Sequence, residues 1–378
     1  MKRTVAILVA LALLPLAASA QSVAPFRMPS TRMAALGGPH AASVNGVDSI
    51  FENPAGFASE DSELSIASLV INPSGPVFDI AGIILGGNDL ETGLISLLDS
   101  SGRLYVSADV LGPLAFAYSG KGLGFGLFNT SNVTVNASSL MTVKYSVSEE
   151  FLLVGGYAYR FSLGERQTLD VGVMPKGFIR AAIADSKSLS DVVDMASDPG
   201  SLLGSPFTMT SGLGIDIGLR WSYDDLLAIG LVARDAYSPA MVTKYTGYQV
   251  FIDSPSSGVT TNALVPADLS LGFAYSPRSS LLSAMGARVL VLLDYTNILD
   301  LFRVLPRNPI LNVGLGLEAT LLEILSVRAG IKDALPTAGL GIDLSFCTFS
   351  LAMYGKELGI EPGSRPVYNL LVSFEFRY

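Results

Sequence analysis

The sequence predicts an all-β protein, a transmembrane antiparallel β-barrel of about 14 strands. The chain of 378 residues is apolar, with a mean hydropathy of +0.47 and only 15% charged residues, against ~25% in soluble domains. After residue 20 it has no apolar run of about 18 residues, the length that a membrane-spanning helix needs. Apolar and polar residues instead alternate along much of the chain, which is the period of a β-strand.

Residues 1–20 have the pattern of a secretory signal peptide. Lys2 and Arg3 precede an apolar run over 5–17, and the small residues at 18–20 form a cleavage site. We therefore expect an exported mature chain that begins at Gln21. For an exported β-barrel the expected location is the cell outer membrane.

The strands are predicted from alternation over residues 62–378, the expected barrel domain. From Leu213 to Tyr223, six apolar residues alternate with Gly, Asp, Arg and Ser, so a strand places all six on one face. Expected strand lengths of about 9–12 residues suit a tilted membrane crossing. The alternative is a secreted soluble β-sandwich, whose strands are typically shorter. Short turns fall on one side of the predicted strands, and long outer loops are expected at 180–210 and 239–266.

Residues 21–61 precede the first predicted strand and lack the alternation. The stretch Met33–Ala58 begins with a Leu-Gly-Gly sequence and ends with Asn53-Pro54-Ala55-Gly56. It resembles the N-terminal hatch of FadL-type outer-membrane transporters of long-chain fatty acids and other hydrophobic compounds, a group that also includes barrels associated with secretion. The C-terminal aromatic Tyr378 is similar to the signal by which such barrels are assembled.

This resemblance implies that the barrel lumen is plugged by the hatch and that substrate leaves through a lateral gap beside it. Carried over, the hatch residues are Asn53, Pro54, Ala55 and Gly56. Their chemistry suits this role, because the Asn53 amide can bond polar wall groups, Pro54 fixes φ, and Ala55-Gly56 permits close backbone packing. The alternative is an ordinary turn before the first strand.

Two sets of residues are candidates for ligand contact. The inward-facing arginines could bind an anionic group through two parallel hydrogen bonds. Alternatively, charged residues in the lumen could pair with one another and solvate the hatch. The candidate arginines are Arg160, Arg220, Arg234 and Arg328. A short amphipathic helix capped by Ser188, together with the second loop, could capture a hydrophobic substrate or simply cover the rim. The apolar candidates there are Leu189, Val192, Val193 and Phe251.

The sequence favours transport over catalysis. One histidine, His40, and one cysteine, Cys347, are present, so we expect no enzyme, no metal and no cofactor. A net charge of −9 argues against a nucleic-acid partner. The expected function is passive uptake of long-chain fatty acids or other hydrophobic molecules. Expected partners are such a molecule, outer-membrane lipid and the barrel-assembly machinery. The alternative is a non-transporting barrel that serves as a structural or secretion-system partner.

Overall fold

The computed structural model describes residues 21–26, 28, 30–43, 46–86, 90–98, 102–139 and 141–378. The predicted signal peptide lies outside the described residues. The strands are β1 (Gln21–Ser22), β2 (Glu63–Ser74), β3 (Leu104–Gly120), β4 (Leu123–Ser139), β5 (Thr142–Ser162), β6 (Gln167–Lys187), β7 (Phe207–Tyr223), β8 (Leu227–Tyr237), β9 (Pro239–Tyr245), β10 (Val259–Leu264), β11 (Asp268–Tyr275), β12 (Ala287–Tyr295), β13 (Val313–Leu321), β14 (Leu325–Lys332), β15 (Leu335–Asp343), β16 (Cys347–Glu357) and β17 (Pro366–Arg377).

The helices are short. The α-helices are α2 (Thr31–Ala35), α3 (Ser49–Glu52), α4 (Val77–Leu85), α5 (Leu90–Ser96), α6 (Leu189–Ser197), α7 (Tyr248–Asp253) and α8 (Ser280–Ala284), and the 3-10 helices are η1 (Gly46–Asp48), η2 (Pro54–Ala58), η3 (Pro199–Gly204), η4 (Pro255–Ser257), η5 (Ile298–Phe302) and η6 (Pro309–Asn312). In the described part of the chain no helix has the length and apolar character to cross a membrane.

The sheet closes on itself as a barrel. Neighbouring strands pair antiparallel from β2 to β8 and from β11 to β17, and the pairings β17–β2 and β8–β11 complete the ring. The sequence continues from β8 into β9 and from β10 into β11 across short breaks, and β9 pairs with β10. With β9 counted as the continuation of β8 and β10 as that of β11, the wall has 14 antiparallel strands, which confirms the predicted fold class.

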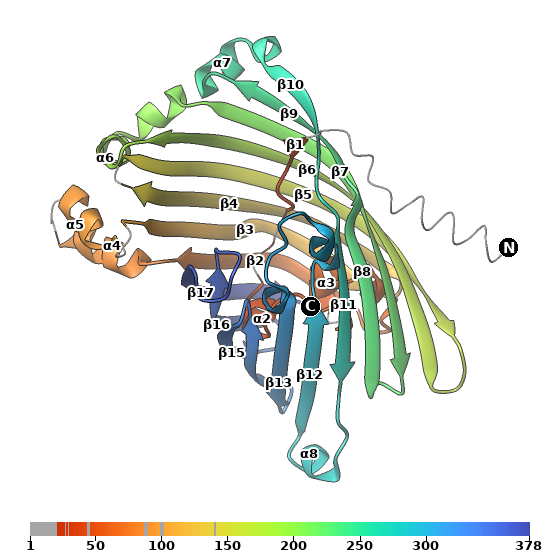
Figure 1. Cartoon of the computed structure of the whole chain (residues 1–378). Coiled ribbons are helices and arrows are strands. Elements are labelled where there is room, and N and C mark those ends of the chain that lie inside the picture. Colours follow the sequence, from red (N-terminus) through yellow and green to blue (C-terminus); the bar gives the residue numbers. More distant parts are fainter. Residues whose placement is uncertain are drawn as a thin grey trace.

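Five neighbouring strands are longer than the ~9–12 residues expected for a membrane crossing. β3 to β7 have 17 to 21 residues. At ~3.3 Å per residue, and even at a ~45° tilt, the longest exceed the ~30 Å of a hydrocarbon core. Figure 1 shows β3–β7 extending past the shorter strands, with α4, α5 and α6 at their ends.

The two predicted long loops are correspondingly shorter than expected. β6 continues to Lys187 and β7 begins at Phe207, so the first connection is 188–206 and contains α6. β9 and β10 occupy the two ends of the second range, which leaves 246–258 with α7 between them. The capped helix predicted after Ser188 is confirmed as α6: the Ser188 side chain accepts a hydrogen bond from the Asp191 N–H, and Asp191 bonds back.

The outer wall is apolar. Many large apolar side chains that alternate along the strands point outward and are exposed, including Leu153 at 62% and Leu213 at 70%. Their inward neighbours are small or polar, such as Gly212, Gly214 and Asp216 along β7. This is the arrangement that a barrel wall in contact with lipid requires.

An N-terminal segment fills part of the lumen. We call residues 30–43 and 46–58 the inner segment; it contains α2, η1, α3 and η2. Figure 1 shows α2 and α3 enclosed by the ring of strands. Ile50, Phe57 and Ala35 belong to the main buried apolar cluster, together with wall residues. The molecule's core therefore lies between the inner segment and the inner face of the barrel.

Candidate functional site: the inner segment and the wall around it

Local sequence explains how the inner segment folds. Ser30 caps α2 by accepting a hydrogen bond from the Met33 N–H, as Ser does at helix N-termini. Asn53 caps η2, because its Oδ1 accepts from the Ala55 N–H at 3.0 Å, and Pro54 follows at the first helical position. The four predicted hatch residues thus form one compact turn.

Asn53 joins this turn to the rest of the structure. Its side-chain amide donates to the Ala41 carbonyl at 2.6 Å and to the Leu219 carbonyl of β7 at 3.2 Å. The residue is 0% exposed, so water could not donate to these two carbonyls if the Asn53 amide were removed. Pro54, Ala55 and Gly56 are buried beside it.

Glycines in the wall make room for the inner segment. A Cβ atom on Gly218 would lie 1.8 Å from Asn53 Oδ1, and one on Gly230 would lie 1.9 Å from the Ala41 carbonyl oxygen. Real side chains do not tolerate such contacts, so the backbone approach requires glycine. We call the glycines that contact the inner segment in this way the glycine belt: Gly124, Gly156, Gly172, Gly218, Gly230, Gly272, Gly314, Gly316, Gly330 and Gly339.

Sequence reasoning missed the glycine belt, although its signal was visible. Gly218 in β7 and Gly314, Gly316 and Gly330 in β13 and β14 occupy inward positions of the alternating pattern. Glycine weakens a strand unless another chain segment approaches closely. Repeated inward glycines could therefore have indicated a filled lumen.

Polar wall residues anchor the inner segment. His40 Nδ1 lies 2.5 Å from Asp294 Oδ2 of β12, and its Nε2 lies 2.9 Å from the Leu36 carbonyl. Asp294 also accepts the Ala41 N–H at 2.7 Å. All of these groups are buried, and such contacts stabilise the segment because no solvent can replace them.

The four predicted arginines lie at separate points of the inner wall. Arg160 forms a bidentate pair with Asp170 at 2.7 and 3.0 Å, and Arg220 contacts the same carboxylate at 3.5 Å. Arg234 and Arg328 lie apart from this pair, on β8 and β14. The structure therefore brings Arg160 and Arg220 together at one carboxylate, while Arg220 and Arg328 both line one cavity.

Two of these arginines also hold the inner segment. Arg220 donates to the Ala42 carbonyl at 3.0 Å. Arg234 donates to the Phe51 and Glu52 carbonyls at 3.0 and 2.8 Å. Arg328 contacts Glu318 at 2.7 Å. A ligand-binding role for the four arginines stays a prediction, while their protein partners are observed.

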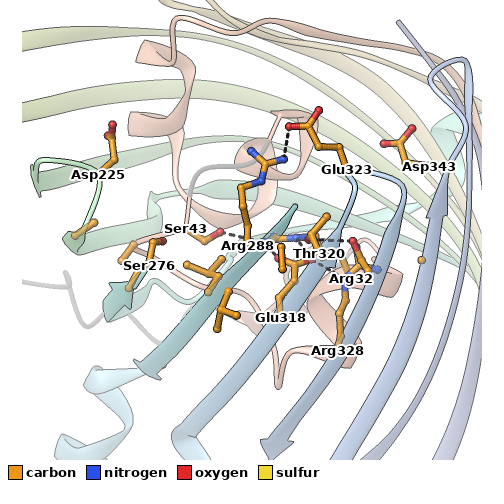
Figure 2. Close-up of a pocket in the computed structure, with 18 of the residues that line it drawn as sticks. Arg32, Ser43, Asp225, Ser276, Arg288, Glu318, Thr320, Glu323, Arg328 and Asp343 are labelled. Atoms are coloured by element: carbon orange, nitrogen blue, oxygen red, sulfur yellow. Dashed lines mark hydrogen bonds and ion pairs between the residues drawn. The ribbon is translucent and has the colours of Figure 1, made fainter. Parts of the chain in front are cut away.

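A buried ionic cluster connects the inner segment with β13 and β14. Arg32 donates to Glu318 at 2.9 and 3.3 Å, and Arg328 donates to the same carboxylate at 2.7 Å. Figure 2 shows Arg32 and Arg328 converging on Glu318. Asp48 and Glu52 lie on the other side of Arg32, at 4.0 and 3.6 Å.

Glu52 is the least favourably placed carboxyl of this cluster. It is 0% exposed, and neither side-chain oxygen has a hydrogen-bond partner among the described residues. Burial raises the pKa of Glu52 to about 8, with the nearby Arg32 opposing and Asp48 reinforcing that rise. A carboxyl at this position therefore binds a proton near neutral pH.

This raised pKa predicts a pH-dependent inner segment. Between about pH 4.5 and 8, the buried Glu52 carboxyl retains a proton that it would release after displacement, so the segment loses stability as pH rises. Amide protection factors in α3, measured by hydrogen exchange, should fall about tenfold or more from pH 6 to pH 9. Glu52→Gln, which stays neutral, should remove this fall. The exposed Glu165→Gln should keep it, and equal pH dependence in both variants would contradict the assignment to Glu52.

A polar cavity of about 700 Å³ lies beside the ionic cluster. It is bounded by Arg32 and Ser43 of the inner segment and by residues of β7, β8 and β11–β17. Its rim includes Asp225 and Glu323, which belong to the short turns between strands. Six arginines and five carboxylates line it: Arg32, Arg220, Arg278, Arg288, Arg328 and Arg377, with Asp225, Glu318, Glu323, Asp343 and Glu375.

A large apolar cluster packs against the inner segment around Phe51. The Phe51 ring lies 5.0 Å from the Phe128 ring of β4 and 6.3 Å from that of Phe26. Val70 of β2 and Leu111 of β3 are buried in the same cluster. We call this region the apolar side of the inner segment, and the surroundings of the ionic cluster and its cavity the ionic side. Further ion pairs, such as Arg180–Glu150, lie elsewhere on the inner wall.

The ladder next to the apolar side is interrupted. Pairing between β2 and β3 stops at Ser65–Ala117 and resumes at Val70–Leu111 with a shifted register. Between Leu111 and Ala115, β3 also has two more residues than the facing part of β4. This is a bulge, which bends a strand and locally ends pairing.

The predicted capture residues lie in two separate clusters. Leu189 is buried with Leu104, Ala137 and Val143, and Val192 packs against this group; Val193 is half-buried on the same helix. Phe251 instead packs on Phe207 at 4.9 Å between ring centres, with Tyr245 and Tyr248 around it. Substrate capture by these residues stays a prediction.

The fold and its contents define the class: a closed 14-stranded β-barrel with a folded segment inside. No family model and no curated protein sequence matches the chain. Among solved structures it is similar to the toluene transporter TbuX of Ralstonia pickettii, with 12% identity, TM-score 0.50, and 95% of this chain and 99% of that chain covered.

Two further solved structures cover most of the chain. The toluene transporter TodX of Pseudomonas putida has 12% identity and TM-score 0.43, with 93% and 98% of the two chains covered. A FadL homologue of Pseudomonas aeruginosa has 12% identity and TM-score 0.45, with 94% and 99% covered. The chain thus resembles the FadL-type group in fold, as the sequence predicts.

Proposed function

We propose that the protein is an outer-membrane channel for the passive uptake of hydrophobic molecules, such as long-chain fatty acids. The inner segment is the hatch of this channel. TbuX, which shares the fold, is a toluene transporter. The apolar outer wall supports a membrane location, because outward side chains such as Leu153 and Leu213 would otherwise face water.

The apolar cluster beside the inner segment is the observation that carries this proposal. The inner segment lies within the ring of strands and is held there by buried polar contacts. The apolar side near Phe51 and Phe128 leads toward the interrupted ladder between β2 and β3. A hydrophobic molecule would follow this side and leave through the wall at the bulge, so that it never crosses the ionic side.

Uptake by whole cells tests the proposal. The full chain is expressed in a bacterial host that lacks its own channel for fatty acids, and uptake of radiolabelled oleate and toluene is measured. Deleting Pro113 removes the one residue by which β3 exceeds β2 between the two paired stretches. It also removes a position without a backbone N–H, so regular pairing of β2 with β3 should be restored. Uptake should fall about tenfold or more, since a closed ladder leaves no lateral path.

Barrel insertion must be checked separately in this experiment. Each variant is checked for folding by its heat-modifiable mobility on gels. Surface labelling then shows whether it is inserted in the membrane. A deletion variant that is inserted and takes up substrate at the original rate would rule out the lateral route. If the unmodified chain takes up neither substrate and carries no lipid after extraction, the non-transporting alternative is favoured instead.

A further inference from the structure

The ionic side of the lumen contains polar groups that the protein itself does not satisfy. Arg328 is 8% exposed, and its Nη1 atom has no hydrogen-bond partner within the described chain. The same is true of the hydroxyl oxygens of Thr348 and Ser373. All three residues line the 700 Å³ cavity. Buried donors that lack partners are costly, so a ligand that accepts hydrogen bonds here would be stabilised.

These groups lie on neighbouring strands. Arg328 belongs to β14, Thr348 to β16 and Ser373 to β17. Ser350 of β16 pairs with both Gly341 of β15 and Ser373 of β17, so it lies between them on the inner face. Three hydroxyls and one guanidinium therefore face the cavity from adjacent positions of the wall.

Gly341 creates the space beside the guanidinium. A Cβ atom there would lie 2.6 Å from Arg328 Nη1, 3.1 Å from Nη2 and 3.1 Å from Ser350 Oγ. The guanidinium thus lies over the glycine, and Ser350 is close to it. Its Nε donates to Glu318, which leaves the edge formed by the two terminal nitrogens for another acceptor.

The charges around the cavity favour an anion. Six arginines and five carboxylates line it, in a chain whose net charge is −9. Glu318 is shared by two arginines, and Arg377 binds Glu375 at 2.6 Å. Asp343 is exposed at the rim. The carboxylates next to the hydroxyls are therefore already neutralised or directed toward solvent.

We propose that this cavity binds an oxyanion, a phosphate or carboxylate group, on Arg328 and the hydroxyls of Thr348, Ser350 and Ser373. A planar guanidinium edge binds both groups through paired hydrogen bonds. The site lies on the ionic side of the inner segment and does not depend on the proposed uptake of hydrophobic molecules.

Direct binding tests the proposal. The purified full chain in detergent is titrated with inorganic phosphate and, separately, with butyrate, whose chain is too short to bind by burial alone. Binding of phosphate alone, of butyrate alone or of both supports an oxyanion site and identifies the group it prefers. Because the readout is binding in detergent, a failed uptake assay does not affect its interpretation.

Three variants assign the binding to this cavity. Gly341→Ala places a methyl group against the guanidinium, while Ser373→Ala and Thr348→Val each remove a hydroxyl. Each should weaken binding about tenfold, the effect of losing a hydrogen bond to a charged group. Gly164→Ala is the control, since a Cβ atom there meets nothing within 4 Å.

Heat-modifiable mobility must show that each variant remains folded. The proposal is overturned if the unmodified chain binds neither probe at millimolar concentrations. It is equally overturned if the three variants bind the probes as tightly as the control.

Discussion

Gly218→Leu is expected to displace the inner segment and raise the ion conductance of the barrel in planar lipid bilayers. A Cβ atom at this position would lie 1.8 Å from Asn53 Oδ1 and 3.0 Å from the Ala55 nitrogen. The remainder of a leucine side chain has no space between β7 and η2. Overpacking costs about 1–3 kcal/mol, which raises the population of displaced segments about 5- to 150-fold. Conductance should rise by a similar factor if displacement opens the lumen.

The matched control is Gly155→Leu on β5. A Cβ atom on Gly155 meets nothing within 4 Å, so this substitution adds the same side chain without touching the inner segment. Conductance of the control should equal that of the unmodified chain. If Gly218→Leu is folded and conducts no more than the control, the inner segment does not restrict the lumen.

The barrel could be predicted because its main signal is local. Alternation over Leu213–Tyr223 identified most of β7, which the structure extends to Phe207. The short turns expected on one side of the barrel include Asp224-Asp225 and Leu322-Glu323, and all four residues have positive φ. Strand period and tight turns depend on residues close in sequence, so one chain is sufficient to locate them.

The long strands could not be predicted in the same way. The second half of β4, Asn129–Ser139, is mostly polar, and apolar residues alternate only over 133–137. It pairs with residues 142–151 of β5, whose side chains include Glu149 and Glu150. Outside the membrane both faces of a sheet can be polar, so the apolar alternation that marks a lipid-facing strand is absent there.

The candidate site depends on contacts between residues far apart in sequence. His40 and Asp294 are separated by 254 positions, and Arg32 and Glu318 by 286. The resemblance placed Asn53–Gly56 in the lumen. It did not indicate which wall residues hold them, because register around a closed barrel is set by strand pairing as a whole. The four arginines were selected as inward-facing, and two of them bind the inner segment's carbonyls.

Asn53→Ala is the second substitution with a large expected effect, because it detaches η2 from its surroundings. The change removes donors to the Ala41 and Leu219 carbonyls and the acceptor for the Ala55 N–H. Each buried group left without a partner costs about 1–3 kcal/mol. Hydrogen exchange should therefore show protection factors for the amides of residues 49–58 that are at least about tenfold lower, and conductance should rise as it does for Gly218→Leu.

Two comparison variants separate the role of the Asn53 hydrogen bonds from a general loss of an asparagine. Asn53→Asp retains the acceptor for the Ala55 N–H, but it replaces the donor with a carboxylate that faces two carbonyl oxygens. It should therefore destabilise the segment at least as much as alanine does. The exposed Asn262→Ala on β10 should change neither protection nor conductance. Unchanged protection in both Asn53 variants would mean that the glycine belt and the buried ion pairs hold the segment without this side chain.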